Sequence, residues 1–562
     1  PKIQRPHAFL VDHFHLKMSL NMKPRMMNVK LPYAVMLLLA CLSSSYLPLS
    51  VAASLTSKKN PHILMIVVDD LGSHDLGIHG SGIETPHSDA LAAQGVYLDQ
   101  YYVLPYCSPT RAALMSGKYP LHTGLHDFIP PNSTAGLPLR EETLADLLKR
   151  AGYHTNAIGK WHIGHSKWEQ TPTFRGFDEF YGFYHGGEDY FSHKHGGAYD
   201  LRHDRGSRCG KGCSQVVDER GEYSTSLFAN ETIRMVKEYA ASIANNATAG
   251  PLFQYLAFQA VHCPTQVPQE YIKRYSNRTK WTPQRKIYAG MLTAADEAIG
   301  QVVRAYQVAG LWNDTLVIFT TDNGGPTTTG CVTGASNYPK RGGKCSLWEG
   351  GTTGDGFLSG PALKGLNIPG GKRFPYLFHV VDWFPTIAEW IDVVPVHQDE
   401  LDGNSQAESL KQQGAPAART ELFIGFVEQE YSNAKHWFGP SLRHLNWKVV
   451  QGDYAGPDEF NPTPIGTLNP MPGGLSNSTY LLFDLDQDPL ERVNVADDYP
   501  DILQDMIYKL KLYQQSYVGP QTNDGSDCPF GGFVPDPLVG PTWEPWCTNN
   551  GSPSDSAQIL KA

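Results

Sequence analysis

The chain has 562 residues, of which 41% are hydrophobic and 11% aromatic, so it can bury a large core and is expected to form two or three domains. Lys and Arg number 46 against 56 Asp and Glu. The resulting net charge of −10 argues against a nucleic-acid-binding protein, which normally presents a basic face. With 54 Gly, 41 Pro and only 18% charged residues, the composition is that of a loop-rich globular protein and not of a disordered one.

The first segment of the chain has the pattern of a targeting sequence. Basic residues precede the apolar run 34–42, and small residues follow it as far as Ala53. The apolar run is shorter than the ~20 residues that a membrane span needs. We therefore interpret residues 1–53 as a cleaved signal peptide with an upstream segment, which predicts passage through the secretory pathway and no stable membrane span.

Two further features agree with export. Asn-x-Ser/Thr tripeptides, the acceptors of N-glycosylation, occur at Asn132, Asn230, Asn246, Asn277, Asn313, Asn477 and Asn550. The chain also has nine cysteines, and close neighbours among them are expected to form disulfides. The predicted bridges are Cys209–Cys213, Cys331–Cys345 and Cys528–Cys547. This pairing leaves Cys263 outside the three bridges.

Buried strands alternate with helices along most of the chain. In chain order, strands are predicted at 62–68, 154–158, 252–258 and 315–321, and helices at 141–151 and 285–309. Residues 62–68 are a continuous apolar run rich in β-branched residues, which is typical of a strand buried on both faces, and 252–258 and 315–321 repeat this buried-strand pattern. The alternation predicts an α/β fold with a large, mostly parallel sheet flanked by helices.

The alternation ends in a polar, Ala/Gln/Gly-rich stretch at 406–418. We place a domain boundary there, so that residues 54–415 form the larger domain. The elements predicted beyond the boundary are short strands at 447–450 and 480–485 and a helix at 501–515. Residues 416–562 are therefore expected to form a smaller C-terminal α+β domain with an antiparallel sheet.

Carboxylate and amide side chains follow two of the predicted buried strands. Asp69 and Asp70 come directly after the first strand, and Asp322 and Asn323 come directly after the last. Ligands of open α/β sheets bind beyond the carboxyl ends of strands, so the two pairs can converge. Their oxygens are hard ligands that suit Ca²⁺ or Mg²⁺ and fit Zn²⁺ poorly. Either pair alone is more simply a turn cap.

Cys107 opens the most specific motif, Cys107-Ser-Pro-Thr-Arg111. Pro109 is placed to be the first residue of a helix that continues over 112–115. Cys107 would then lie at a helix N-terminus, where unpaired N–H groups favour an anion. The alternative is an ordinary structural or disulfide-bonded cysteine.

Several basic side chains accompany these motifs. Lys160 and His162 lie two residues apart after a predicted strand and face the same side if the chain stays extended. His262 follows another strand, and Lys344 lies in a Gly-rich loop. Each alone is more simply a surface or packing residue. Together with Arg111 they would place positive charge beside a divalent cation, which is what an oxyanion ester needs.

Taken together, these motifs resemble those of the sulfatase family. The family signature is Cys-x-Pro-x-Arg followed by a Ser/Thr-Gly-Lys/Arg stretch, represented here by Cys107–Arg111 and Ser116-Gly117-Lys118. The similarity covers residues 60–500 and includes the Asp-Asp-Leu-Gly, Gly-Lys-Trp-His-Ile-Gly and Asp-Asn-Gly-Gly stretches. Tyr101-Tyr102, residues 188–190 and residues 346–351 are most similar to the arylsulfatase B (N-acetylgalactosamine-4-sulfatase) branch.

The resemblance implies an alkaline-phosphatase-like fold, with 54–415 as the catalytic domain, and a covalent mechanism. The formylglycine-generating enzyme would oxidise Cys107 to formylglycine, whose hydrate is a geminal diol. One hydroxyl would attack sulfur, and the second would lose its proton and expel sulfate. Serine has no second hydroxyl for that step.

The resemblance also implies a role for each remaining site residue. Asp69, Asp70, Asp322 and Asn323, with residue 107, would hold one Ca²⁺ ion. Arg111 would fix the diol and the metal site, and His162 would take the proton. Lys160, His262 and Lys344 would bind the sulfate and neutralise its charge.

The function that the resemblance implies is hydrolysis of sulfate esters. The substrates would be aryl sulfates and the N-acetylgalactosamine 4-sulfate units of glycosaminoglycans, handled by a lysosomal or secreted enzyme. Two alternatives stay open at this point. One is a phosphoester or phosphonate hydrolase of the same superfamily, and the other is an inactive, sulfatase-like carbohydrate-binding protein.

Overall fold

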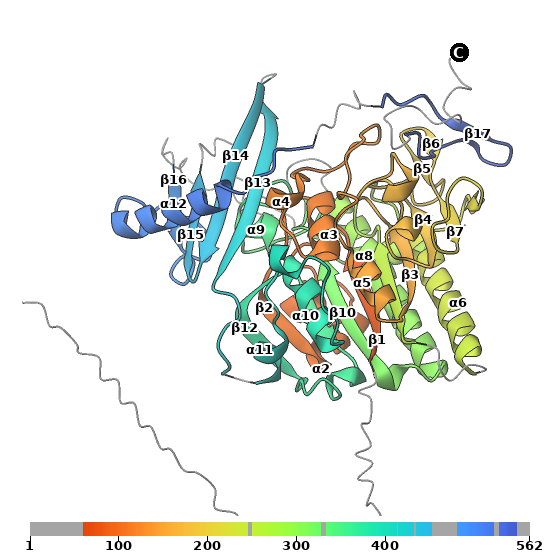
Figure 1. Cartoon of the computed structure of the whole chain (residues 1–562), viewed down its shortest axis with the longest axis horizontal. Coiled ribbons are helices and arrows are strands. Elements are labelled where there is room, and N and C mark those ends of the chain that lie inside the picture. Colours follow the sequence, from red (N-terminus) through yellow and green to blue (C-terminus); the bar gives the residue numbers. More distant parts are fainter. Residues whose placement is uncertain are drawn as a thin grey trace, which may run out of the picture. The chain divides into compact units, whose positions relative to one another are not determined.

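A ten-stranded, mostly parallel sheet carries the larger part of the fold (Figure 1). The computed structural model describes residues 60–244, 250–327, 333–412, 414–431, 434–451, 480–521 and 528–547. In spatial order the sheet comprises β12 (Lys372–His379), β2 (Val96–Tyr102), β11 (Gly356–Ser359), β10 (Thr315–Thr321), β1 (His62–Val68), β9 (Leu252–Phe258), β3 (His154–Lys160), β4 (Glu179–Phe183), β7 (Arg202–Arg205) and β8 (Ser214–Val216). The predicted α/β class is confirmed.

The central strand β1 is buried on both faces, as its apolar run predicts. Ile63 and its alternate neighbours pack against α3 (Cys107–Ser116), α5 (Leu144–Arg150) and α10 (Trp383–Trp390). Leu64 and its alternate neighbours pack against α6 (Ser224–Ala244) and α8 (Pro283–Val308). Successive side chains of a strand point to opposite faces, so one apolar run serves two helical layers.

The predicted strands at 62–68, 252–258 and 315–321 have the bounds of β1, β9 and β10. The helix predicted at 141–151 is shorter, because Thr143 caps it. The Thr143 hydroxyl accepts the N–H of Asp146, whose carboxylate in turn accepts the N–H of Thr143. The remaining helices are α2 (Pro86–Gln94), α4 (Pro120–Thr123), α7 (Gln269–Arg274), α9 (Glu349–Thr352), α11 (Ala407–Lys411) and α12 (Pro500–Gln514).

A second, antiparallel sheet lies toward the C-terminal end, as predicted. Its strands are β13 (Glu421–Tyr431), β14 (Ala434–His444), β15 (Trp447–Gln451) and β16 (Tyr480–Asp484), and α12 packs against β14 and β15. The boundary predicted between residues 415 and 416 stays a prediction. Buried polar contacts join this sheet to the large one, because Arg443 of β14 binds the hydroxyl of Tyr102 in β2.

A third sheet pairs strands from the end of the described chain with a hairpin at residues 194–199. β17 (Val534–Asp536) and β18 (Gly540–Thr542) extend the hairpin of β5 (Lys194–His195) and β6 (Ala198–Tyr199), next to which β17 is drawn in Figure 1. The predicted bridges Cys209–Cys213 and Cys528–Cys547 are present. The second of these bridges closes the segment that carries β17 and β18.

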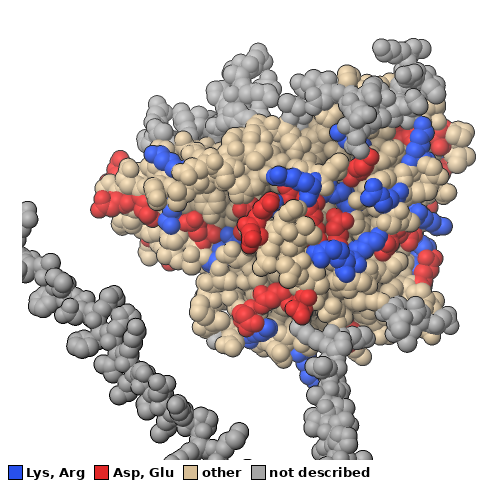
Figure 2. Space-filling view, viewed as in Figure 1, with Lys and Arg blue, Asp and Glu red and all other residues tan. Residues whose placement is uncertain are grey.

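The surface of the described residues carries both signs of charge. Figure 2 shows basic and acidic side chains interspersed on the face that it draws. The acceptor asparagines Asn132, Asn230, Asn277 and Asn313 are exposed, whereas Asn246, Asn477, Asn550 and the predicted signal peptide at 1–53 lie outside the described residues. Within the described part of the chain, no helix combines the length and the apolar character that crossing a membrane requires.

Candidate active site

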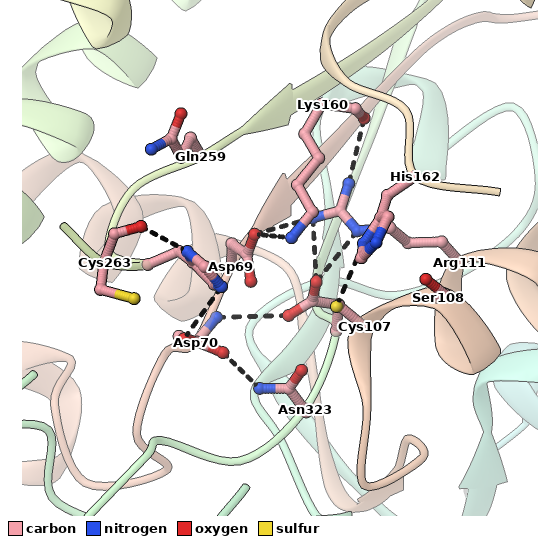
Figure 3. A network of polar contacts seen from close by, with 12 residues as sticks. Asp69, Asp70, Cys107, Ser108, Arg111, Lys160, His162, Gln259, Cys263 and Asn323 are labelled. Atoms are coloured by element: carbon pink, nitrogen blue, oxygen red, sulfur yellow. Dashed lines mark hydrogen bonds and ion pairs between the residues drawn. The ribbon is translucent and has the colours of Figure 1, made fainter. Parts of the chain in front are cut away.

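The carboxyl ends of four adjacent parallel strands meet at one edge of the large sheet. β10, β1, β9 and β3 lie side by side in parallel. The predicted residues that follow or end them are Asp322 and Asn323 (β10), Asp69 and Asp70 (β1), His262 (β9), and Lys160 and His162 (β3). Figure 3 shows the labelled members of this set gathered in one place with Cys107 and Arg111. The structure therefore brings the predicted site residues together.

Cys107 is the first residue of α3 and is 3% exposed. The helix begins two residues earlier than the position of Pro109 predicted, because a proline is tolerated throughout the first turn, where no intrahelical N–H bond is lost. The Cys107 Sγ atom lies 3.3 Å from His162 Nδ1. Burial raises the pKa of the Cys107 thiol. As a thiol, residue 107 is therefore neutral.

His162 presents an unprotonated nitrogen to residue 107. Its Nε2 atom lies 3.0 Å from the carbonyl oxygen of Ile129, which only accepts hydrogen bonds, so Nε2 carries the proton. Burial, reinforced by the charge of Lys160, holds the pKa of His162 well below its usual value. The sequence argument assumed an extended chain at His162, but this residue has φ 60° and the chain is not extended there. The side chains of Lys160 and His162 nevertheless both face the site (Figure 3).

Arg111 ties α3 to two strands from within the core. Its Nε and Nη2 atoms lie 3.0 and 2.9 Å from Asp322 Oδ2, and its Nη1 atom donates to the carbonyl of Lys160 at 3.1 Å. Arg111 is 1% exposed, so these charge-assisted bonds are shielded from water. The position of residue 107 is thus fixed relative to both β10 and β3.

Two lysines bind the two aspartates that follow β1. Lys160 Nζ lies 2.5 Å from Asp69 Oδ2, and Lys344 Nζ lies 2.6 Å from Asp70 Oδ1. Burial alone would raise the pKa of both carboxyls, but the charges of Lys160 at Asp69 and of Lys344 at Asp70, with that of His262, outweigh it and lower them. Both carboxylates are therefore ionised.

The oxygen cluster fits a hard divalent cation. Among the described residues, the buried atoms Asp69 Oδ1 and Asn323 Oδ1 have no hydrogen-bond partner. Ligand atoms of Asp69, Asp70 and His262 lie within 4.8 Å of one another. Asp322, a predicted ligand, is bound by Arg111, and burial together with the charge of Asp69 raises its pKa. Buried oxygens without partners are what a cation would satisfy.

His262 lies beside the same carboxylates. Its Nε2 atom is 3.9 Å from Asp70 Oδ2, and its Nδ1 atom donates to the carbonyl of Cys263 at 2.6 Å. The Tyr190 hydroxyl donates to the carbonyl of His262 itself at 2.8 Å. Burial and the charge of Lys344 lower the pKa of His262. The ring is therefore held with Nε2 toward the charged cluster.

Two cysteine predictions are wrong. Cys345 is a thiol and not part of a bridge with Cys331, and burial raises its pKa to about 12. Its backbone has φ 67° and donates to the carbonyl of Pro105, which turns the side chain toward an apolar cluster next to α3. Cys263 is disulfide-bonded. Cys331 itself lies outside them.

A cavity of about 590 Å³ opens onto the site. It is lined by the site residues Asp70, Cys107, His162, His262 and Lys344 and also by Tyr106, Phe128, Ile129, Pro131, Glu188, Asp189, Lys194 and His195. A pocket of this size accepts a sugar-sized or aryl-sized group. The site can therefore hold an anionic ester with its charge beside the charged site residues and the rest of the ester against the other lining residues.

Sequence reasoning missed the glycine pair that packs against the two histidines. A Cβ atom on Gly186 would lie 2.6 Å from His162 Cε1, and one on Gly187 would lie 3.2 Å from the His262 ring. In the sequence, two adjacent glycines directly before residues 188–190 could have indicated a close approach of the backbone to other groups. The carbonyl of Ile129, which orients His162, left no signal, because every residue has a carbonyl.

Comparisons with known proteins agree on one family. The sequence model of the family described as Sulfatase matches residues 61–393. Arylsulfatase J of Mus musculus is 33% identical over 485 residues, which cover 83% of this chain and 78% of that protein. N-acetylgalactosamine-6-sulfatase of Sus scrofa is 30% identical over 363 residues, which cover 61% of this chain and 64% of that protein. The crystal structure of Ps i-CgsB in complex with k-i-k-neocarrahexaose has a TM-score of 0.68 at 27% identity, covering 83% of this chain and 96% of that one.

Proposed function

The chain belongs to the sulfatase family and is a sulfuric ester hydrolase, and from this premise we propose that it uses a formylglycine made from Cys107. The observation that carries the proposal is the pairing of residue 107 with an unprotonated nitrogen of His162 at 3.3 Å. The ammonium groups of Lys160 and Lys344 bind the two aspartates of the same site, and the ring of His262 lies beside those aspartates. This arrangement supplies a nucleophile, a base and cationic groups at one place.

The proposed reaction proceeds in two steps at residue 107, a displacement at sulfur and an elimination of sulfate. One hydroxyl oxygen of the formylglycine hydrate bonds to sulfur, the bond from sulfur to the alcohol oxygen breaks, and the proton of the attacking hydroxyl ends on the departing alcohol oxygen. His162 Nδ1 then accepts the proton of the second hydroxyl, and the bond from the residue 107 carbon to the sulfate oxygen breaks. Sulfate leaves, the aldehyde reforms, and water rehydrates it. The balance is ester plus water giving alcohol and hydrogen sulfate.

The chain's charged residues supply positioning for both steps. Arg111 holds the first turn of α3 against Asp322, so that residue 107 does not move relative to the strand ends. Lys344 lines the cavity and binds Asp70, and the buried Lys160 binds Asp69; we expect both to share their charge between the aspartates and a bound sulfate. Asp69, Asp70, Asn323 and Asp322 would hold Ca²⁺. A bound Ca²⁺ would supply charge neutralisation for the sulfate oxygens.

We further propose that the natural substrate is a sulfated amino sugar of the N-acetylgalactosamine 4-sulfate type. The stretches 188–190 and 346–351 support the arylsulfatase B branch. The similarity to a sulfatase named for N-acetylgalactosamine supports a galactosamine substrate without deciding the position of the sulfate. The exposed acceptor asparagines and the two disulfides support a lysosomal or secreted enzyme, whose maturation partner is the formylglycine-generating enzyme.

The proposal predicts modification of residue 107 together with sulfate-ester turnover. Protein made in a host with the formylglycine-generating enzyme should show an aldehyde at residue 107 by mass spectrometry, and it should hydrolyse p-nitrophenyl sulfate and N-acetylgalactosamine 4-sulfate. p-Nitrophenyl phosphate is the comparison substrate. An unmodified thiol with no turnover would refute the mechanism, and preferred turnover of the phosphate would favour the phosphoesterase alternative. Faster cleavage of N-acetylgalactosamine 6-sulfate than of the 4-sulfate would contradict the assignment of the 4-sulfate as the substrate.

A second prediction concerns the cation. Dialysis against EGTA should lower kcat for p-nitrophenyl sulfate by at least about 100-fold, because the charge on the sulfate oxygens would lose its principal partner. The melting temperature should fall as well, since a ligand that binds only the folded state stabilises it. Added Ca²⁺ should restore both quantities, and Zn²⁺ should not. Full activity in protein shown by elemental analysis to hold no divalent metal would contradict the proposal.

A further inference from the structure

One wall of the cavity over Cys107 is apolar and ends in an exposed aromatic ring. The residues of this wall are Tyr106, Phe128, Ile129 and Pro131. Tyr106 is 4% exposed, whereas Phe128 is 46% exposed although its ring borders the site. A large aromatic side chain that lines a pocket and stays open to water has apolar area still available for a ligand.

The position of Phe128 is fixed by the catalytic machinery on one side. Directly after it, the N–H of Ile129 donates to the Ser108 hydroxyl at 3.1 Å, and the carbonyl of Ile129 accepts from His162 at 3.0 Å. The N–H of Phe128 itself donates to Asp127 Oδ1 at 2.7 Å. The backbone that carries the ring is therefore bonded both to the helix of Cys107 and to the proposed base.

The ring also has a packed neighbour. The centroids of the Phe128 and Tyr106 rings are 6.4 Å apart with an interplanar angle of 47°. Tyr106 immediately precedes Cys107, so the two aromatic rings lie beside the nucleophile position. A ring that is held in place loses little conformational freedom when a ligand covers it.

A different loop supplies polar groups to the same cavity. Lys194 and His195 form β5 and line the cavity, with Lys194 exposed. The Trp543 indole donates to the carbonyl of His195 at 2.7 Å, and this hydrogen bond anchors β5. The cavity thus offers both apolar contact and hydrogen-bond donors to a group attached to a bound sulfate.

We propose that Phe128 is a specificity-determining residue that stacks on the sulfated pyranose ring of the substrate. A pyranose has one face made of C–H groups and an edge of hydroxyls, which matches an aromatic wall and a polar strand. Because the sulfate is bound next to Cys107, the pyranose ring attached to it would lie close to the apolar wall that includes Phe128. This inference rests on the proposed hydrolysis of sulfate esters and adds the residue that recognises the ring.

The test compares Phe128→Ala with the wild type on three probes: N-acetylgalactosamine 4-sulfate, p-nitrophenyl sulfate and inorganic sulfate. We expect KM for both ring substrates to rise about tenfold, with kcat changed less than about twofold, because the lost contact is made equally in the ground and transition states. The inhibition constant of inorganic sulfate should change less than about twofold, since sulfate has no ring. Phe128→Tyr should restore KM to within about threefold.

The control variant is Tyr508→Ala, which removes a 61% exposed aromatic ring from α12 and should leave every constant unchanged. Wild-type KM values in Phe128→Ala would overturn the inference while the enzyme's activity stands. An equal rise in the inhibition constant of sulfate would show that Phe128 acts through the anion site, and it would also overturn it. An effect on the aryl sulfate alone would overturn the pyranose assignment. Absence of turnover in the wild type would instead refute the proposed function.

Discussion

Replacing Cys107 with serine should lower kcat for p-nitrophenyl sulfate by at least about 10⁴-fold. Serine has one hydroxyl, which can accept a sulfate group from the ester but leaves no second hydroxyl whose deprotonation would expel it. The variant should therefore release at most one equivalent of p-nitrophenol per enzyme and then stop. Rapid-quench measurement of the phenol, with mass spectrometry of the residue 107 peptide, should find the serine sulfated.

Cys107→Ala is the matched control for this experiment. Alanine has no nucleophile, so neither a burst nor a sulfated peptide should form. The side chain at 107 is buried and small, and both variants should keep the wild-type melting temperature to within a few degrees. Many turnovers by Cys107→Ser would mean that an outside nucleophile, and not the diol of residue 107, releases the sulfate.

The second large effect concerns Lys448, which joins the C-terminal sheet to the loop of Lys344. Lys448 is fully buried in β15, and its Nζ lies 3.0 Å from Glu349 Oε1 and 2.7 Å from Glu491 Oε1. Lys448→Met should lower the free energy of unfolding by about 3–5 kcal/mol, because it removes the cation that both buried carboxylates bind. Urea unfolding followed by tryptophan fluorescence measures the change. The control is Lys509→Met, which removes a half-buried ion pair with Glu421 and should cost less than about 1 kcal/mol.

The cost of Lys448→Met should depend on pH. Burial raises the pKa of Glu491 to about 7 although the charge of Lys448 opposes it, so the stability that this carboxyl contributes is lost as the pH rises toward and through 7. Without Lys448, Glu349 and Glu491 face each other, and protonation relieves their repulsion at low pH. The difference between variant and wild type should therefore be smaller at pH 5 than at pH 8. A difference that is equal at both values would mean that lost packing, and not charge, sets the cost.

The central strands were predictable because burial on both faces leaves segments that are mostly apolar along their whole length. This pattern marked β1, β9 and β10 with their observed bounds. The sheet of β17, β18, β6 and β5 was not predicted, because its strands have two or three residues and carry no period. Their pairing joins Tyr199 to Thr542, and local patterns contain no information about partners so far apart in the chain.

In the site, the charged side chains could be predicted from the sequence, whereas the backbone conformation and the cysteine pairing could not. Charged side chains at strand ends were visible in the sequence, and the strand order brings them together at one edge of the sheet. The Cys331–Cys345 pairing failed because nearness in sequence is only a weak guide to nearness in space. Cys345 has a left-handed backbone and packs against an apolar cluster, and neither this φ nor the disulfide of Cys263 has a local sequence signal.

The anchoring of α3 by Arg111 determines how long residue 107 can stay accessible during synthesis of the chain. Arg111 and Asp322 are separated by 211 residues, so the ribosome must add that length before the helix of Cys107 can be held in its buried place. At about 5–20 residues per second, this takes roughly 10–40 s. Residue 107 is 3% exposed in the folded chain, which leaves an oxidising enzyme little access afterwards. If Cys107 is converted to formylglycine as proposed, its conversion competes with folding, and slower translation between the two residues should raise the fraction of chains that become active.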